Sequence, residues 1–197
     1  MSKKGSNTTT GYLPWDSFIS LITRLENKGE YKFCLLIAIG VFTGLRISDL
    51  LNLKYGDLLN GDTLKVQEKK TKKYRSIRIN NDLKILVQRI YHKLGLTSQD
   101  QYIFLNRFGN KPIDKSYVNV KLKELFAFYK IKVDGNLSSH IFRKTLGRRV
   151  MELNNFSNES LVLLMELFGH SSMSITKRYL GIRQKEINDI YLSVSLS

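Results

Sequence analysis

Cysteine, proline and acidic residues are scarce in this sequence of 197 residues. Cys34 is the single cysteine, so no intrachain disulfide and no cysteine-based metal site can form. It lies in an apolar run, which predicts a buried structural thiol, and a lone thiol is typical of a reducing, intracellular compartment. Because Pro14 and Pro112 are the two prolines, most segments are free to be helical.

Metal ligands of other kinds are also sparse. The three histidines, His92, His140 and His170, are too far apart in sequence for a recognisable zinc spacing. No metal site is therefore predicted.

The deficit of acidic residues gives the chain a large positive charge. It has 17 Asp and Glu against 32 Lys and Arg, a formal net charge of +15. Such an excess favours a polyanionic partner, with a basic protein that has no such partner as the plain alternative. No segment approaches the roughly 20 apolar residues of a membrane-spanning helix. We therefore expect nucleic acid, and not a membrane, as the partner.

The pattern of apolar residues predicts a mainly α-helical domain with a small antiparallel β-sheet, an α+β fold. A hydrophobic fraction of 42% is enough for one sizeable core, which we expect within residues 12–180. Residues 1–11 are predicted to be a flexible lead-in. Two strands are expected within 63–79 and a short extended piece at 102–104. Helices are expected at 14–25, 30–43, 46–53, 81–94, 115–129, 140–153, 159–168, 172–180 and, in a tail formed by 181–197, at 184–193.

Two segments place cations where they can meet a phosphate. Arg46 follows the glycine break at Gly44, at the start of a predicted helix, and can present its planar guanidinium group from a rigid base. The run from Glu68 to Arg75 forms a basic turn between the two predicted strands, which can contact phosphates in a DNA groove. Arg46 alone is more often an ordinary surface arginine, and the basic turn alone is equally compatible with a solvated hairpin tip.

Two further segments carry histidine, arginine and tyrosine. His140 and Arg143 are three positions apart on a predicted helix, so both side chains can point at one site. Gly169 ends the next helix before His170, and Tyr179 follows about two and a half turns into the last one. Tyr179 alone would be one half-buried aromatic among 10 tyrosines, so the joint pattern matters.

In order and spacing, these segments resemble the motifs of the tyrosine recombinase or phage integrase family, from Tyr12 onward. The resemblance implies the catalytic-domain fold of that family and DNA cleavage and rejoining through a 3′-phosphotyrosyl intermediate. Arg46 and Arg143 match the two arginines that clamp the phosphate. Asp49 matches an acid that supports the first arginine, and His170 matches a further hydrogen-bond donor to the phosphate.

The same resemblance implies the groups that move protons. Tyr179 matches the nucleophile and His140 the residue that accepts or shuttles its proton. Lys70 matches the hairpin lysine that protonates the leaving 5′ oxygen, although its neighbours in the turn leave the choice among the lysines open. No metal and no nucleotide cofactor are implied. The additional cations expected to contact DNA are Lys69, Lys72, Lys73, Arg75 and Lys144.

The resemblance also implies partners. We expect double-stranded DNA and other recombinase subunits, as a tetramer on DNA and a monomer alone, in the cytoplasm of a bacterium or encoded by a phage. Family members usually carry a further N-terminal DNA-clamping domain, which we expect to be absent from residues 1–197. We favour a fragment of a longer protein over a naturally minimal one. Apolar residues of the tail, Ile187, Ile190, Tyr191 and Val194, suit docking on a neighbouring subunit or packing on their own domain. A non-catalytic DNA-binding regulator and a type IB topoisomerase are the alternative functions.

Overall fold

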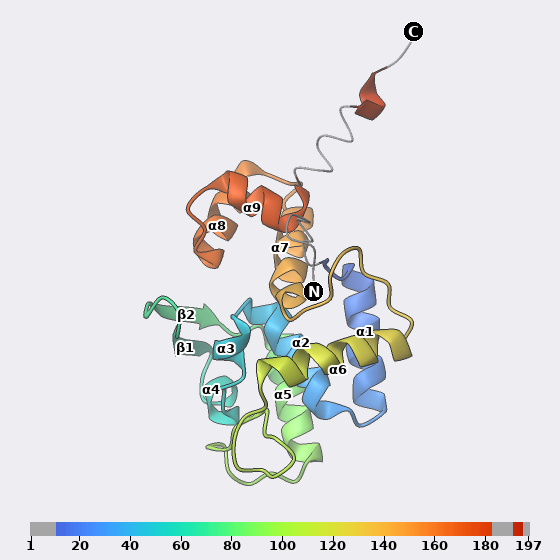
Figure 1. Cartoon of the computed structure of the whole chain (residues 1–197). Helices are drawn as coiled ribbons and strands as arrows, with labels where there is room; N and C mark the ends of the chain where they lie inside the picture. The colour runs from blue at the N-terminus through green and yellow to red at the C-terminus, as the bar shows by residue number, and fades with distance from the viewer. Residues whose placement is uncertain (1–10, 183–190, 195–197) are drawn as a thin grey trace.

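Helices make up most of the chain that the computed structural model describes, residues 11–182 and 191–194 (Figure 1). One two-stranded antiparallel sheet completes the described part. The predicted fold class, mainly α with a small antiparallel sheet, is confirmed. The elements are α1 (Trp15–Asn27), α2 (Tyr31–Thr43), α3 (Ile47–Leu50), α4 (Tyr55–Leu59), β1 (Thr63–Gln67), β2 (Tyr74–Arg78), α5 (Asn81–Lys93), α6 (Lys115–Phe128), α7 (His140–Leu153), α8 (Asn158–Phe168) and α9 (Met173–Leu180).

The segment after Arg46 differs from its prediction. The helix expected at 46–53 is the single turn α3, and the unpredicted helix α4 follows it. A carboxylate oxygen of Asp57 accepts a hydrogen bond from the backbone N–H of Lys54 at 2.8 Å, which caps α4. The helix was not predicted because Gly56, inside it, has a low helix propensity. The extended piece expected at 102–104 is no strand but an isolated bridge between Lys54 and Tyr102.

Several predictions concern residues outside the described part of the chain. The lead-in lies there except for Gly11, and so does most of the helix expected at 184–193. Ile187 and Ile190 of the tail are also outside it. Tyr191 and Val194 are described, and both are exposed.

Helix α2 lies at the centre of the main core. Its sequence is apolar on all sides, and ten of its residues are buried among α1, α5 and α7 (Figure 1). Cys34 is fully buried there, and this burial raises the pKa of its thiol to about 12, as expected for a structural cysteine.

Helix α7 joins this core to a second, smaller one. Phe142 packs in the main core, whereas Met151 packs with α8 and α9. In Figure 1, α7 runs from the group formed by α8 and α9 down to α2. A Cβ atom at Gly147 would lie 2.5 Å from Cδ2 of Leu180, so a glycine is needed there for α9 to pack closely on α7. This packing holds α9, and Tyr179 with it, over α7.

The two strands form a hairpin beside α3 (Figure 1). Thr63 pairs with Arg78 at one end and Gln67 with Tyr74 at the other. The backbone N–H of Glu68 donates to the carbonyl of Lys73 at 2.9 Å, which closes the turn. The basic turn is therefore a defined structure. Among the described residues, no helix has the length and apolar character needed to cross a lipid bilayer.

Candidate active site

Two helices end at the site, and both end at a glycine in the left-handed region. Gly44 follows α2 with φ of 60°, and Gly169 follows α8 with φ of 65°. The last carbonyl groups of a helix lack partners within the helix and carry partial negative charge, so they attract cations. The ends of α2 and α8 therefore form a base on which arginines can be fixed.

Arg143 and Arg46 meet at this base. Arg143 donates from Nη1 to the carbonyl of Gly44 at 2.6 Å and from Nη2 to the carbonyl of Phe168 at 3.2 Å. Arg46 donates from Nη2 to the same Phe168 carbonyl at 3.3 Å. The structure thus brings together two arginines, Arg46 and Arg143, that are far apart in the sequence. Two cations that share one acceptor present a concentrated positive charge.

Arg143 is the more buried of the two, with 5% of its surface exposed. Its guanidinium carbon lies 4.8 Å from the ring centroid of Phe168. Desolvation lowers its pKa below the ordinary value of an arginine; Tyr179 opposes this shift, and Arg46 and Arg75 act in the same direction as desolvation. An arginine stays protonated in proteins, so Arg143 is a fixed and partly desolvated charge.

Arg46 precedes α3 and pairs with Glu68. Its Nη1 lies 2.6 Å from Oε2 of Glu68, a separation that defines an ion pair although the N–H is not aligned for a hydrogen bond. Asp49, the acid predicted to support Arg46, bonds elsewhere. Its Oδ1 accepts from the backbone N–H of Lys69 at 3.0 Å and from the hydroxyl of Ser48 at 3.3 Å. The acid beside Arg46 is therefore Glu68, because α3 turns Asp49 toward the hairpin backbone.

Tyr179 lies against both histidines. Its hydroxyl donates to the backbone carbonyl of His140 over a long 3.5 Å, and its ring centroid lies 5.1 Å from that of His170. Burial raises the pKa of the phenol above its ordinary value of 10, while the charge and hydrogen bonding of Arg143 oppose the rise. The phenol is therefore protonated near neutral pH.

Both histidines are biased toward the neutral form. Desolvation lowers the pKa of His140, and nearby cations, first Lys115 and then Arg143, lower it further. The desolvation comes from the side of the residue that faces the protein, since much of the residue is exposed. The pKa of His170 is lowered by desolvation, then by Arg143 and Arg46. Neutral imidazoles can each accept one proton and donate another.

His170 is fixed by a residue that sequence reasoning missed. Its Nδ1 lies 3.0 Å from Oγ1 of Thr176, a side chain that is fully buried. The six-residue separation crosses a turn and a helix start, so helical spacing gave no signal for this pair. Glu68 was missed as well, although it is the one acid in the basic run 68–75 and could have been singled out on that ground.

The remaining predicted cations are distributed differently. The side chains of Lys69, Lys70, Lys72 and Lys73 are exposed on the hairpin turn. Within the described residues, the ammonium group of Lys70 has neither a hydrogen bond nor an ion pair, so the structure does not bring it onto the arginines. Arg75 is partly buried and lies 3.3 Å from Oε1 of Glu68.

Lys144, predicted to contact DNA, is buried beside the tyrosine. It has 5% of its surface exposed, and its Nζ lies 5.2 Å from the ring centroid of Tyr179. Desolvation lowers its pKa to about 8. A buried ammonium group does not present itself to a phosphate on the surface, so its position favours a role within the site. The sequence prediction counted charge without burial, and contact of Lys144 with DNA stays a prediction.

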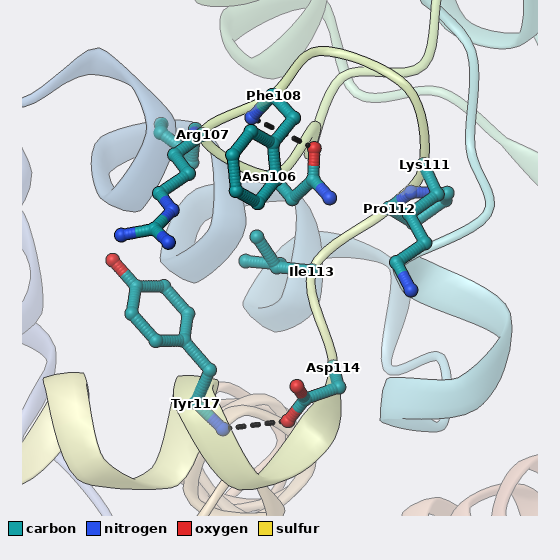
Figure 2. Close-up of a pocket in the computed structure, with 9 residues that line it drawn as sticks. Asn106, Arg107, Phe108, Lys111, Pro112, Ile113, Asp114 and Tyr117 are labelled. Carbon is teal, nitrogen blue, oxygen red and sulfur yellow. Dashed lines mark hydrogen bonds between the residues drawn. The ribbon is translucent and has the colours of Figure 1, made fainter.

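A separate cavity of about 620 Å³ lies elsewhere, between the loop 106–113 and the start of α6 (Figure 2). Its lining includes Arg107, whose guanidinium carbon lies 4.6 Å from the ring centroid of Phe108. None of the predicted site residues lines it. The candidate site lies instead at the ends of α2 and α8 and on the helices α7 and α9, which carry Arg143 and Tyr179.

Comparison with known proteins relates the chain to DNA recombinases. A model of the phage integrase family matches residues 13–186. The chain is 33% identical over 167 residues to the probable integrase/recombinase YoeC of Bacillus subtilis, covering 85% of this chain and 86% of that protein. It is 29% identical over 148 residues to the tyrosine recombinase XerH of Campylobacter jejuni, covering 74% of this chain but 40% of that protein.

Solved structures have the same fold. The crystal structure of XerA recombinase superposes with a TM-score of 0.68 at 19% identity, over 93% of this chain and 65% of that one. XerH site-specific recombinase bound to its difH substrate gives a TM-score of 0.65 at 22% identity, over 93% of this chain and 54% of that one. The chain therefore spans roughly half to two thirds of these longer proteins.

Proposed function

This chain belongs to the phage integrase family, and from that premise we propose that it is a tyrosine-type site-specific recombinase that cleaves and rejoins double-stranded DNA. One observation carries the proposal beyond the family match. Arg46 and Arg143 share the Phe168 carbonyl beside Tyr179, so two fixed cations lie next to a potential nucleophile. A phosphodiester is anionic, and its attack requires such charge to be neutralised.

The proposed step forms a bond from the Tyr179 oxygen to phosphorus and breaks the bond from phosphorus to the 5′ oxygen. The products are a 3′-phosphotyrosyl ester and a free 5′ hydroxyl. Arg46, Arg143 and His170 stabilise the charge that develops on the non-bridging oxygens. The ester retains the energy of the broken bond, so attack by a 5′ hydroxyl in the reverse direction rejoins DNA. The step balances without a metal or a nucleotide cofactor.

Two protons move in this step. The phenol of Tyr179 must lose its proton as it attacks, and the neutral imidazole of His140 is the proposed acceptor. The leaving 5′ oxygen must gain a proton, for which Lys70 on the hairpin is the proposed donor. The unpaired and exposed ammonium group of Lys70 is compatible with that role, since it has no internal partner among the described residues to give up.

DNA binding is proposed to depend on the hairpin. Lys69, Lys72, Lys73 and Arg75 would contact phosphates and position the duplex, in keeping with the net charge of +15. Solved relatives include a lambda integrase dimer bound to a COC′ core site. We propose that this chain likewise acts with other subunits, as a tetramer on DNA and in the cytoplasm, and that the apolar tail residues Tyr191 and Val194 dock on a neighbour.

Covalent trapping tests the proposed function. Nicked suicide duplexes cut from DNA that flanks the gene are incubated with wild-type protein and with Tyr179→Phe, and adducts are resolved by denaturing electrophoresis. We expect an adduct with the wild type that is absent from Tyr179→Phe. If every flanking duplex is bound but none becomes attached, the chain is a DNA-binding regulator and the enzyme proposal is wrong. Relaxation of a supercoiled plasmid without exchange between sites would instead indicate a topoisomerase.

A further inference from the structure

We propose that Glu68 is a positioning residue that holds the hairpin carrying Lys70 against Arg46. Glu68 follows β1 and begins the turn in which Lys70 lies. The inference rests on the proposed function, in which Arg46 binds the phosphate and Lys70 protonates the leaving oxygen. The buried carboxylate of Glu68 thereby sets the position of Lys70 relative to Arg46.

The contacts of Glu68 reach both sides of the site. Oε2 lies 2.6 Å from Nη1 of Arg46 and accepts from the hydroxyl of Thr71 at 2.7 Å. Oε1 lies 3.3 Å from Nη1 of Arg75, on β2. One side chain thus joins the residue before α3, the turn and the second strand of the hairpin. Its removal would free all three of these groups at once.

Burial makes this junction strong enough to matter. The Glu68 side chain is 7% exposed, and that of Arg46 is 21% exposed. Exposed ion pairs contribute little, but a buried acid that loses its cations, or a buried cation that loses its acid, is strongly destabilised. Burial acts to raise the pKa of Glu68, but the hydrogen bond from Thr71 and the ion pair with Arg46 outweigh it, so the net pKa is lowered and the carboxylate stays ionised.

A second carboxylate, that of Asp49, fixes the same turn at the residue before Lys70. Asp49 of α3 accepts a hydrogen bond from the backbone N–H of Lys69 at 3.0 Å. Lys70 therefore stands between two tethered residues, with Lys69 held by Asp49 and Thr71 held by Glu68. The backbone at Lys70 is fixed while its side chain is left exposed. This is the arrangement required of a group that must reach one atom of a bound substrate.

The experiment uses the leaving group to separate positioning from stability. A 5′-bridging phosphorothiolate replaces the leaving 5′ oxygen with sulfur, and a thiol, with a pKa of about 8.5, leaves without needing a proton. Single-turnover cleavage is measured for wild type, Glu68→Gln and Lys70→Ala on oxygen and sulfur versions of the trapped duplex. Glu68→Gln keeps the size of the side chain and removes its charge. Glu124→Gln, at an exposed acid that pairs with Lys121, is the matched control.

We expect Glu68→Gln and Lys70→Ala to lose about tenfold or more on the oxygen duplex and to recover most of that loss on the sulfur duplex, because general acid catalysis contributes about 10²–10⁴-fold. Glu124→Gln should match the wild type on both. If Glu68→Gln loses activity equally on both duplexes, Glu68 acts through Arg46 or through folding alone, and the inference is overturned. No loss on either duplex would overturn it as well. If the wild type cleaves neither duplex, the proposed function fails instead. A Lys70→Ala loss that sulfur does not restore removes Lys70 as the acid, and the inference with it.

Discussion

Nδ1 of His170 lies 3.0 Å from the hydroxyl oxygen of Thr176, which is fully buried. When the hydroxyl donates to Nδ1, the one proton of the neutral imidazole sits on Nε2, where it can be donated to a phosphate oxygen. The alternative acceptor of this hydroxyl, the carbonyl of Ser172, lies at 3.4 Å. Thr176 is thus able to select the tautomer of His170.

Replacement of this hydroxyl tests that role. Thr176→Val keeps the shape of the side chain and removes the donor, so we expect cleavage to slow by about tenfold, since one misplaced hydrogen bond to a developing anion is worth about 1–3 kcal/mol. Thr176→Ser retains the hydroxyl and should keep most of the rate. Single-turnover cleavage and urea unfolding are measured together. A Thr176→Val rate equal to that of the wild type would show that the tautomer of His170 does not depend on this contact.

Arg143 is expected to be intolerant of even a conservative change. Lysine has one ammonium group and cannot satisfy the carbonyls of Gly44 and Phe168 while also facing a phosphate. Arg143→Lys should therefore lower the cleavage rate by about 10²-fold or more. Arg107→Lys, at an exposed arginine of the cavity in Figure 2, is the control and should cleave normally. Normal adduct formation by Arg143→Lys would contradict the two-carbonyl account.

Stability should fall in mildly acidic solution because of two histidines. The pKa values of His140 and His170 lie below the ordinary 6.5 in the folded protein. As pH falls through about 6.5, the unfolded chain binds more protons than the folded one, and the free energy of unfolding decreases. Above this window both states are neutral and the loss is absent. The lowered pKa of Glu68 acts separately, since its stabilisation is lost only below its ordinary 4.5.

Urea unfolding between about pH 5 and 7.5 measures this dependence. The double variant His140→Gln, His170→Gln should flatten it, and His92→Gln on the exposed surface of α5 should not. An unchanged slope in the double variant would assign the acid sensitivity to other groups.

Lys72 and Lys144 should affect DNA binding differently, although both are cations of the predicted interface. Lys72 is exposed, so Lys72→Gln should weaken binding and reduce the dependence of affinity on salt by about one counterion. Lys144 is buried against Tyr179, so Lys144→Met should leave the salt dependence unchanged and slow cleavage. Fluorescence anisotropy across salt concentrations distinguishes the two. A reduced salt dependence of DNA binding in Lys144→Met would show that Lys144 contacts a DNA phosphate.

Most elements of the fold follow from local sequence. Gly44 and Gly169 end their helices because each permits the left-handed backbone of a cap, and Asn80 and Ser157 begin theirs by accepting backbone N–H bonds. These are interactions between near neighbours, so the sequence suffices to predict them. Helix α4 was missed because Gly56 lowers its local propensity, while burial of Tyr55 and Leu58 supplies the missing stability.

The sequence by itself also determined which residue types are available for phosphate chemistry, through the order of Arg46, His140, Arg143, His170 and Tyr179. Only the tertiary structure decided how they are held. In the folded protein Arg46 forms its ion pair with Glu68 instead of Asp49, His170 contacts the hydroxyl of Thr176, and Lys144 is buried. Several of these contacts join segments that are far apart in the chain. Their geometry depends on how α7, α8 and the hairpin pack together, and the spacing of residues along the sequence does not specify that packing.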